Sequence, residues 1–332
     1  MPTVSPALGP VAVTGASGFI GSHVVLALAR KGYAVRACIT DPGNPLKTEH
    51  LLAMNEGHPG SVTLHQANLL EEGSYDAPFA GCCAVMHVGT AMGYGGANKP
   101  QQVYDAAVGG TQNVVRSLQK AGTVRRIVYT SSFSAISHPA PSGYMFTEDD
   151  WASDNRENDP SWSLENLDEK GEVGYAMGKV ATERYLFDLA AEDGAFEAIS
   201  ICPLVVLGPL LGKAHDLVFS WQWFLGRMLR GKDCTRGWQH LWNIVDVRDV
   251  ATACGLALSA DISGAPVFII AAADTVMPRD SASLMAEVYP GVALRGDLDG
   301  QQTLLSIDRA RHELGYEPRF SWRDEVAPPL GA

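Results

Sequence analysis

The sequence predicts a doubly wound α/β fold built on a parallel sheet of about seven strands. The first observation is a series of short, nearly continuous apolar runs, which are typical of parallel strands covered by helices on both faces. These runs are 10–14, 34–39, 62–65, 84–88, 126–130, 198–202 and 266–270. The second is that helical patterns separate them, over 19–31, 101–121, 175–193 and 247–259. Right-handed crossovers then place all seven strands in one sheet.

Length, composition and charge narrow the classes of protein and partner. Of the 332 residues, 46% are hydrophobic and 19% charged, which excludes a disordered or collagen-like chain. The formal net charge of −12 would repel a phosphate backbone, so no nucleic-acid partner is expected. The longest uncharged apolar stretch, 198–212, contains two prolines and is shorter than the ~18 residues of a membrane span. No membrane partner is therefore expected.

The N-terminus and the cysteines bear on location and metal content. Residues 1–10 lack the basic start and apolar core of a secretory signal, so a cytoplasmic location is the default expectation. The six cysteines include no CxxC pair, and four lie in apolar runs where a free thiol packs as a small hydrophobic group. We expect neither a metal site nor a disulfide framework.

A glycine-rich segment directly follows the first strand and opens the first helix. Glycines in this TGxxGxxG pattern permit a tight turn, close approach of a pyrophosphate and close helix-to-sheet packing, while the helix N-terminus offers free N–H groups. A dinucleotide-binding site is therefore predicted, the alternative being a glycine-rich turn without a ligand. The residues expected to contact the cofactor are Gly15, Ser17, Gly18, Phe19, Ile20 and Gly21.

The end of the second strand bears on the choice between NAD and NADP. An acidic residue there binds the ribose 2′-hydroxyl of NAD, and a basic one accommodates the 2′-phosphate of NADP. Arg36 within the strand and Lys47 in the next loop can supply positive charge, and Thr40 can donate a hydrogen bond to phosphate. We interpret Asp41 as facing the following Pro-Gly turn, which favours NADP. NAD stays the alternative, and Arg36 could equally be a solvated or sheet-edge arginine.

Three further residues predict proton-transfer chemistry. Tyr175 and Lys179 lie on one face of a predicted helix, where the ammonium would lower the pKa of the phenol. Ser132 follows the fifth strand at the carboxyl edge of the sheet, where α/β sheets bind ligands. The structural alternatives are a chance tyrosine–lysine pair and a serine turn or helix cap. The order of glycine motif, strand-end serine and tyrosine–lysine helix on one sheet favours a catalytic site.

With these motifs the chain resembles the extended short-chain dehydrogenase/reductase family over nearly its whole length. It is most similar to the branch of dihydroflavonol reductases, cinnamoyl-CoA reductases and microbial carbonyl (aldehyde) reductases. Further likenesses are 32–36, 87–92, 129–132, 148–151 and 203–209. Three departures are Thr40, where that branch usually has Arg, Asn68, where it has Asp, and Gly178, where it has Ser. The first weakens the argument for NADP.

The resemblance implies a role for each matching residue. Ser132 would orient the carbonyl group of the substrate and Tyr175 would be the general acid or base. Lys179 would tune Tyr175 and hold the nicotinamide ribose, and Pro203 would lie beside the nicotinamide. The remaining cofactor contacts that it implies are Asn68, Leu69, Val88, Gly89, Thr90 and Val205.

Two structural units are expected. Residues 1–207, with 238–273 returning to them, form a Rossmann-type dinucleotide-binding domain, and 208–237 with 274–332 form a smaller substrate-binding lobe. Aromatic residues clustered after residue 208 suggest a bulky or aromatic substrate, unless they simply form the core of the lobe. They are Trp221, Trp223, Phe224, Trp238 and Trp242. The long polar stretch 137–174 is expected to cover the substrate cleft as a lid.

The predicted function is an NAD(P)-dependent alcohol dehydrogenase or carbonyl reductase acting on a small molecule. Hydride would pass between the cofactor and the carbonyl carbon while Tyr175 moves the proton. One alternative is a non-catalytic NAD(P)-sensing protein. Another is a nucleotide-sugar epimerase or dehydratase on the same fold, whose diphosphate could bind Arg227, Arg230, Lys232 and Arg236. The resemblance also suggests a homodimer formed through helices 101–121 and 175–193.

Overall fold

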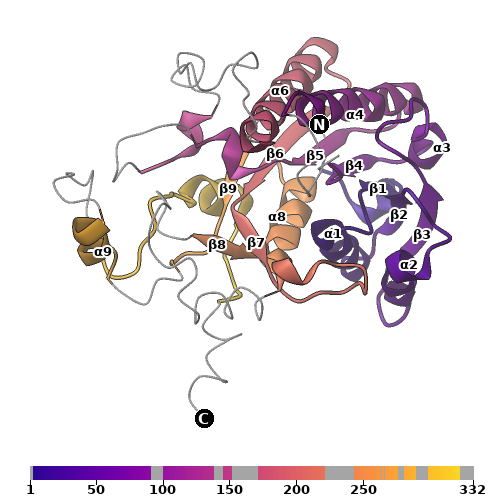
Figure 1. Cartoon of the computed structure of the whole chain (residues 1–332). Coiled ribbons are helices and arrows are strands. Elements are labelled where there is room, and N and C mark those ends of the chain that lie inside the picture. The colour runs from indigo at the N-terminus through magenta and orange to yellow at the C-terminus, as the bar shows by residue number, and fades with distance from the viewer. Residues whose placement is uncertain are drawn as a thin grey trace.

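The computed structural model contains the predicted sheet. It describes residues 3–90, 100–137, 145–151, 171–220, 243–262, 264, 266–275, 280–288 and 298–321. Seven parallel strands pair in the order β3-β2-β1-β4-β5-β6-β9 (Figure 1). They are β1 (Val11–Thr14), β2 (Ala34–Ile39), β3 (Ser61–Gln66), β4 (Ala84–His87), β5 (Arg126–Thr130), β6 (Glu197–Pro203) and β9 (Val267–Ile270). The predicted fold class is confirmed.

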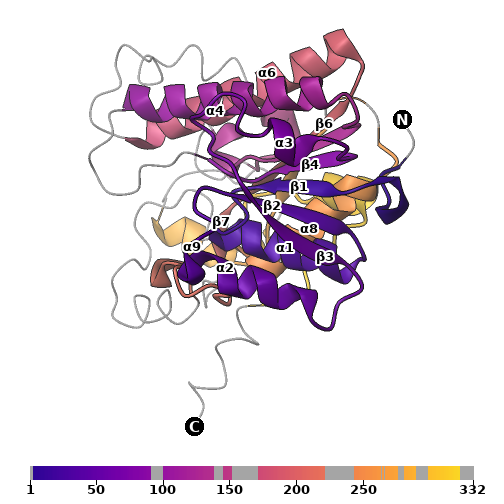
Figure 2. The same cartoon turned by 90° about the vertical axis from the view of Figure 1, so that its right-hand side faces the viewer.

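Helices cover both faces of this sheet. Figures 1 and 2 show α4 and α6 side by side on one face and α1 with α8 on the other. Every residue of β1, β4, β5 and β9 is buried between these layers, as continuous apolar runs predict. The helices are α1 (Phe19–Arg30), α2 (Pro45–Leu52), α3 (Asp76–Phe79), α4 (Pro100–Ala121), α6 (Gly171–Asp193), α8 (Val247–Ser259) and α9 (Ser281–Val288). Among the described residues, no helix is long and apolar enough to span a membrane.

Two local predictions are corrected by the structure. Lys47 lies on helix α2 and not in a loop, because Pro45 occupies the first helical position and the Asn44 side chain accepts a hydrogen bond from the Leu46 N–H. Helix α6 begins at Gly171, so Tyr175 lies in its second turn and the preceding loop is shorter than predicted.

A second, two-stranded parallel sheet was not predicted. It pairs β7 (Val205–Leu207) with β8 (Ile244–Asp246). Strands β7 and β8 thus lie side by side, although one precedes and the other follows residues 208–237 in the chain. The division into a dinucleotide-binding domain and a substrate lobe stays a prediction.

A buried arginine fixes α8 against the amino edge of the sheet. Arg126, the first residue of β5, is 1% exposed, and its Nε donates to Glu197 Oε2 at 2.9 Å. Its Nη1 donates to the carbonyls of Ala257, Leu258 and Ala260 at 3.0, 3.0 and 2.7 Å. These carbonyls lie at the C-terminal end of α8, where backbone acceptors lack helical partners and favour a cation.

Replacing this arginine should destabilise the protein strongly. We expect Arg126→Met to lower the free energy of unfolding by about 3–5 kcal/mol, because it removes the buried cation that bonds Glu197 and the three carbonyls. Urea denaturation measures the change, and Arg125→Met, at the exposed neighbouring position, is the matched control. Equal stability of the two variants would contradict the assigned role of Arg126.

Candidate active site

The glycine motif packs three backbone segments too closely for side chains. Gly15 has a φ of 64°, and a Cβ atom there would lie 2.6 Å from Gly89 Cα. A Cβ atom on Gly21 would lie 2.1 Å from the Gly15 carbonyl oxygen. Only glycine fits both positions, so the end of β1, the start of α1 and the end of β4 meet at one point.

This point is suited to bind a pyrophosphate. Gly18 is the N-cap of α1 and offers no side-chain cap, and the first turn of the helix contains no acidic residue. The first N–H groups of a helix have no partner within it and attract anions. The Phe19 side chain stacks on Phe219 at 5.1 Å, so its backbone N–H is the group suited to a phosphate. The Ser17 carbonyl accepts a hydrogen bond from the His215 ring at 3.2 Å.

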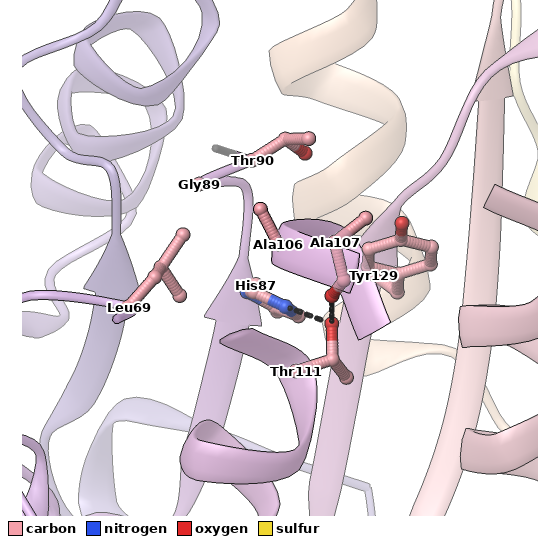
Figure 3. A pocket seen from close by; sticks show the side chains of 8 residues that line it. All are labelled: Leu69, His87, Gly89, Thr90, Ala106, Ala107, Thr111 and Tyr129. Carbon is pink, nitrogen blue, oxygen red and sulfur yellow. Dashed lines mark hydrogen bonds between the residues drawn. The ribbon is translucent and has the colours of Figure 1, made fainter. Parts of the chain in front are cut away.

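A buried histidine that was not predicted holds these elements in place. His87 Nδ1 lies 2.8 Å from Thr14 Oγ1, which also accepts from the Gly89 N–H at 3.0 Å. On its other side, Nε2 lies 3.0 Å from Thr111 Oγ1, which donates to the Ala107 carbonyl (Figure 3). Each hydroxyl therefore donates once and accepts once, so His87 carries its proton on Nε2. Burial and the nearby Lys179 lower the pKa of His87 to about 3, which keeps the ring neutral.

The residues predicted near the adenosine ribose have different contacts. Asp41 Oδ1 accepts from the Gly43 N–H at 3.2 Å, so it faces the Pro-Gly turn as predicted. Thr40 is exposed at the end of β2, and Lys47 is half-buried on α2. The Arg36 guanidinium donates to the carbonyls at positions 78 and 80 at 2.9 and 2.7 Å. Since Arg36 also precedes Thr40 by about 13 Å of strand, its contacts favour a structural role over the predicted phosphate contact.

Some of the other predicted cofactor residues line one narrow pocket. Leu69, Gly89 and Thr90 border it together with Tyr129 at the carboxyl edge of the sheet (Figure 3). Asn68 lies beside Leu69, and its Oδ1 accepts from the N–H of residue 70 at 3.1 Å. The structure thus gathers residues that follow β3 and β4.

Val88, Pro203 and Val205 lie at the same edge of the sheet. Val88 is half-buried directly after β4, Pro203 is the buried last residue of β6, and Val205 is the half-buried first residue of β7. Their predicted contacts with the cofactor stay predictions.

The tyrosine–lysine pair lies at the carboxyl ends of β4 and β5. Lys179 is 3% exposed, and its Nζ donates to the Thr130 carbonyl at 2.9 Å and to Thr90 Oγ1 at 3.0 Å. Nζ is 5.6 Å from the centre of the Tyr175 ring and 4.7 Å from that of Tyr129. Burial lowers the pKa of Lys179 to about 8. An ammonium group beside the Tyr175 ring can stabilise its phenolate.

Ser132 lies where β5 ends. It caps a short 3₁₀ helix (Phe133–Ala135), its Oγ accepting from the Ser134 N–H and donating to Ser134 Oγ, both at 3.2 Å. The structural alternative, a serine cap, is therefore realised. To orient a substrate carbonyl, the hydroxyl must turn its proton away from Ser134.

Several predicted features lie outside the described residues. They are the five aromatic residues between 221 and 242, the four basic residues between 227 and 236, and most of the predicted lid. Of that loop, residue 137, the segment 145–151 and the first turn of α6 are described.

Comparison with known proteins gives the family. The model of the NAD dependent epimerase/dehydratase family matches residues 11–271. The chain belongs to this family. The predicted resemblance to extended short-chain dehydrogenases/reductases is thereby confirmed, and its relatives include reductases of the predicted branch.

Two curated relatives illustrate the likeness. A dihydroflavonol 4-reductase of Arabidopsis thaliana is 38% identical over 203 residues, which are 60% of this chain and 50% of the relative. The cinnamoyl-CoA reductase CAD2 of Medicago truncatula is 29% identical over 323 residues, covering 97% of this chain and 90% of the relative. The match to the dihydroflavonol reductase thus spans about half of that relative's length.

Solved structures share the fold of this family member. Yeast methylglyoxal/isovaleraldehyde reductase Gre2, complexed with NADPH, superimposes with a TM-score of 0.70 at 20% identity, over 97% of this chain and 98% of that chain. Vestitone reductase from alfalfa (Medicago sativa) gives a TM-score of 0.66 at 19% identity, over 97% of each chain.

The neutral His87 makes the stability of this family member depend on pH. Its folded pKa of about 3 lies below the usual 6.5, so the unfolded chain takes up the proton first. The contribution of the neutral His87 to the free energy of unfolding is therefore fully present above pH ~7 and is lost as the pH drops toward 3. At pH 5 His87 alone accounts for a loss of about 2 kcal/mol.

Denaturation at pH 8 and pH 5 measures this loss. His87→Gln should remove about 2 kcal/mol of the difference between the two pH values, whereas the exposed control His312→Gln should leave the difference unchanged. An unaltered pH dependence in His87→Gln would show that the imidazole is not held neutral.

Proposed function

We propose that the protein is an NADP-dependent oxidoreductase that reduces an aldehyde or ketone, preferably a bulky or aromatic one, to an alcohol. The observation that carries the proposal is the buried Lys179 ammonium, which lies beside the Tyr175 ring at the sheet edge that also holds the glycine motif. The activities named for the relatives, dihydroflavonol 4-reductase and cinnamoyl-CoA reductase, support this choice. A cytoplasmic location and a homodimer through α4 and α6 belong to the same proposal.

The chain's residues divide the work of binding the cofactor. The backbone at Gly15 and Gly18 and the N-terminus of α1 would hold the pyrophosphate, and Thr40 with Lys47 would hold the 2′-phosphate. Lys179 uses two of its three ammonium donors on Thr90 and the β5 carbonyl, and the third suits a ribose hydroxyl. When bound, the nicotinamide supplies the hydride.

The proton would come from the tyrosine. Ser132 would donate a hydrogen bond that orients the substrate carbonyl, and Tyr175 would give its phenolic proton to the carbonyl oxygen. The phenolate left behind would be stabilised by the Lys179 ammonium. In the reverse direction the same phenolate would accept the proton of the alcohol.

Removing the phenolic hydroxyl should abolish most of the activity. We expect Tyr175→Phe to lower kcat by ~10²–10⁴, the usual contribution of a positioned general acid, with unchanged affinity for NADPH. NADPH oxidation would be followed with a panel containing methylglyoxal, isovaleraldehyde, benzaldehyde, a dihydroflavonol, cinnamoyl-CoA and a UDP-sugar.

Tyr185→Phe, on the same helix, is the matched control and should keep kcat. Turnover of the UDP-sugar alone would favour the epimerase or dehydratase alternative. Binding of NADPH without turnover of any compound would favour a cofactor sensor. Near-normal turnover by Tyr175→Phe would remove the tyrosine from the mechanism.

Cofactor choice tests the assignment of the 2′-phosphate site. The wild type should have a higher kcat/KM with NADPH than with NADH, and Lys47→Ala should reduce this ratio by about tenfold, since one charge-assisted hydrogen bond is lost. Lys213→Ala is the control, because the Lys213 Nζ lies 2.6 Å from Glu49 Oε2 on α2, the helix that also carries Lys47. A wild-type preference for NADH would show that Asp41 governs the site.

A further inference from the structure

A buried carboxylate lies one helical turn beyond the lysine of the site. Glu183 is 0% exposed, four residues after Lys179 on α6. Its Oε2 accepts from Trp151 Nε1 at 2.7 Å, and its Oε1 accepts from the Ser200 hydroxyl and, at 3.4 Å, from the Cys202 thiol. These donors come from β6 and from the segment 145–151, which are far from α6 in the sequence.

The hydrogen-bond donors around Glu183 favour its charged form, whereas burial opposes it. Burial raises the pKa of Glu183 above its usual value, and the hydrogen bonds from Ser200 and Trp151 oppose this rise. An indole N–H can only donate, so it suits a carboxylate oxygen that only accepts. In turn, burial lowers the pKa of Lys179 and the charge of Glu183 raises it. A charged Glu183 therefore stabilises the Lys179 ammonium.

Other titratable groups that face the pair leave this attraction uncancelled. The groups that face either side chain are His87, Tyr129, Tyr175 and Cys202. Burial lowers the pKa of the imidazole and raises the pKa of Tyr129 and of the thiol, so all three are neutral near pH 7. Of these groups, Glu183 is the one that can place a negative charge near the Lys179 ammonium.

The segment 145–151 that supplies the indole is itself fixed to the sheet. Its Phe146 N–H donates to the Leu304 carbonyl at 3.0 Å, and the buried Glu148 accepts at Oε1 from the Ile269 N–H of edge strand β9 at 2.9 Å. It belongs to the loop that runs from the end of β5 to the start of α6. The segment is therefore held against edge strand β9 and residue 304.

Trp151 connects this segment to the catalytic helix. Its ring lies 5.4 Å from that of Phe187 on α6, and its indole N–H donates to Glu183 one turn earlier. Glu183 thus accepts a hydrogen bond from the 145–151 segment and lies one helical turn from Lys179.

We propose that Glu183 is a positioning residue that keeps the Lys179 ammonium charged and, through Trp151, holds the 145–151 segment against α6. The proposal rests on the proposed function, in which Lys179 acts on Tyr175 and on the cofactor ribose. Glu183 itself touches neither. It couples the charge of Lys179 to the position of the 145–151 segment.

Two variants separate the two roles of the carboxylate. Glu183→Gln keeps the shape and an acceptor for the indole but removes the charge, so the pH above which NADPH affinity falls should drop by about one unit, as measured by NADPH fluorescence. The pH of half-maximal alcohol oxidation should rise by a similar amount, because the Tyr175 phenolate is less stabilised. Trp151→Phe removes the indole donor, so amide hydrogen exchange in 145–151 should become at least tenfold faster, whereas Glu183→Gln, whose amide oxygen still accepts from the indole, should keep the wild-type exchange rate.

Glu192→Gln, at an exposed position of the same helix, is the control and should change none of these measurements. Wild-type pH profiles in a folded Glu183→Gln variant would overturn the proposal. If that variant does not fold, Ser200→Ala decides: the lost donor makes Glu183 easier to protonate, so the pH above which NADPH affinity falls should drop, whereas a lower Tm with this pH unmoved overturns the proposal.

The Tyr175→Phe variant keeps the two proposals distinguishable. Full activity of Tyr175→Phe would refute the proposed function, on which this inference rests. An inactive Tyr175→Phe together with unmoved pH profiles in Glu183→Gln would refute the role of Glu183 alone.

Discussion

The contact between the backbones of Gly15 and Gly89 is the constraint on which the candidate site depends. A Cβ atom at residue 15 would lie 2.6 Å from Gly89 Cα, so β1 and β4 can end at the same point only with glycine there. The same approach lets the Gly89 N–H donate to Thr14, and Thr90, one residue later, accepts from Lys179. The phosphate-binding turn and the lysine are thereby held in one frame.

The sequence predicts those parts of the structure that depend on local pattern. Continuous apolar runs predicted all seven strands, and β5 and α8 have the predicted bounds, with an Asp cap at the start of α8. The glycine motif and the spacing of Tyr175 and Lys179 are local as well. Helix α2 carries a readable signal, the Asn44 cap followed by Pro45, which was missed because the helix is only eight residues long.

Contacts between distant segments could not be predicted in this way. His87 lies in an apolar strand and resembles a core residue, since its partners Thr14 and Thr111 are 73 and 24 positions away. Glu183 and Trp151 are separated by 32 positions and carry no motif spacing. For Arg36, the sequence supplies a charge but not its direction, and backbone carbonyls near α3 take up the guanidinium.

Buried charges at the two edges of the sheet have different partners, and this difference indicates which edge is suited to catalysis. At the amino edge, Arg126 bonds directly to Glu197 and to helix carbonyls, and although burial opposes it, Arg126 holds the pKa of that carboxyl below its usual range. Such a closed pair contributes structure and has little capacity to respond to a ligand. At the carboxyl edge, the Lys179 ammonium donates to a carbonyl and a hydroxyl, the Glu183 carboxyl lies a helical turn away, and burial lowers the pKa of Lys179 to about 8. An ammonium group with these partners is stabilised further when it bonds a ligand hydroxyl or a phenolate, as expected of a group that acts in proton transfer.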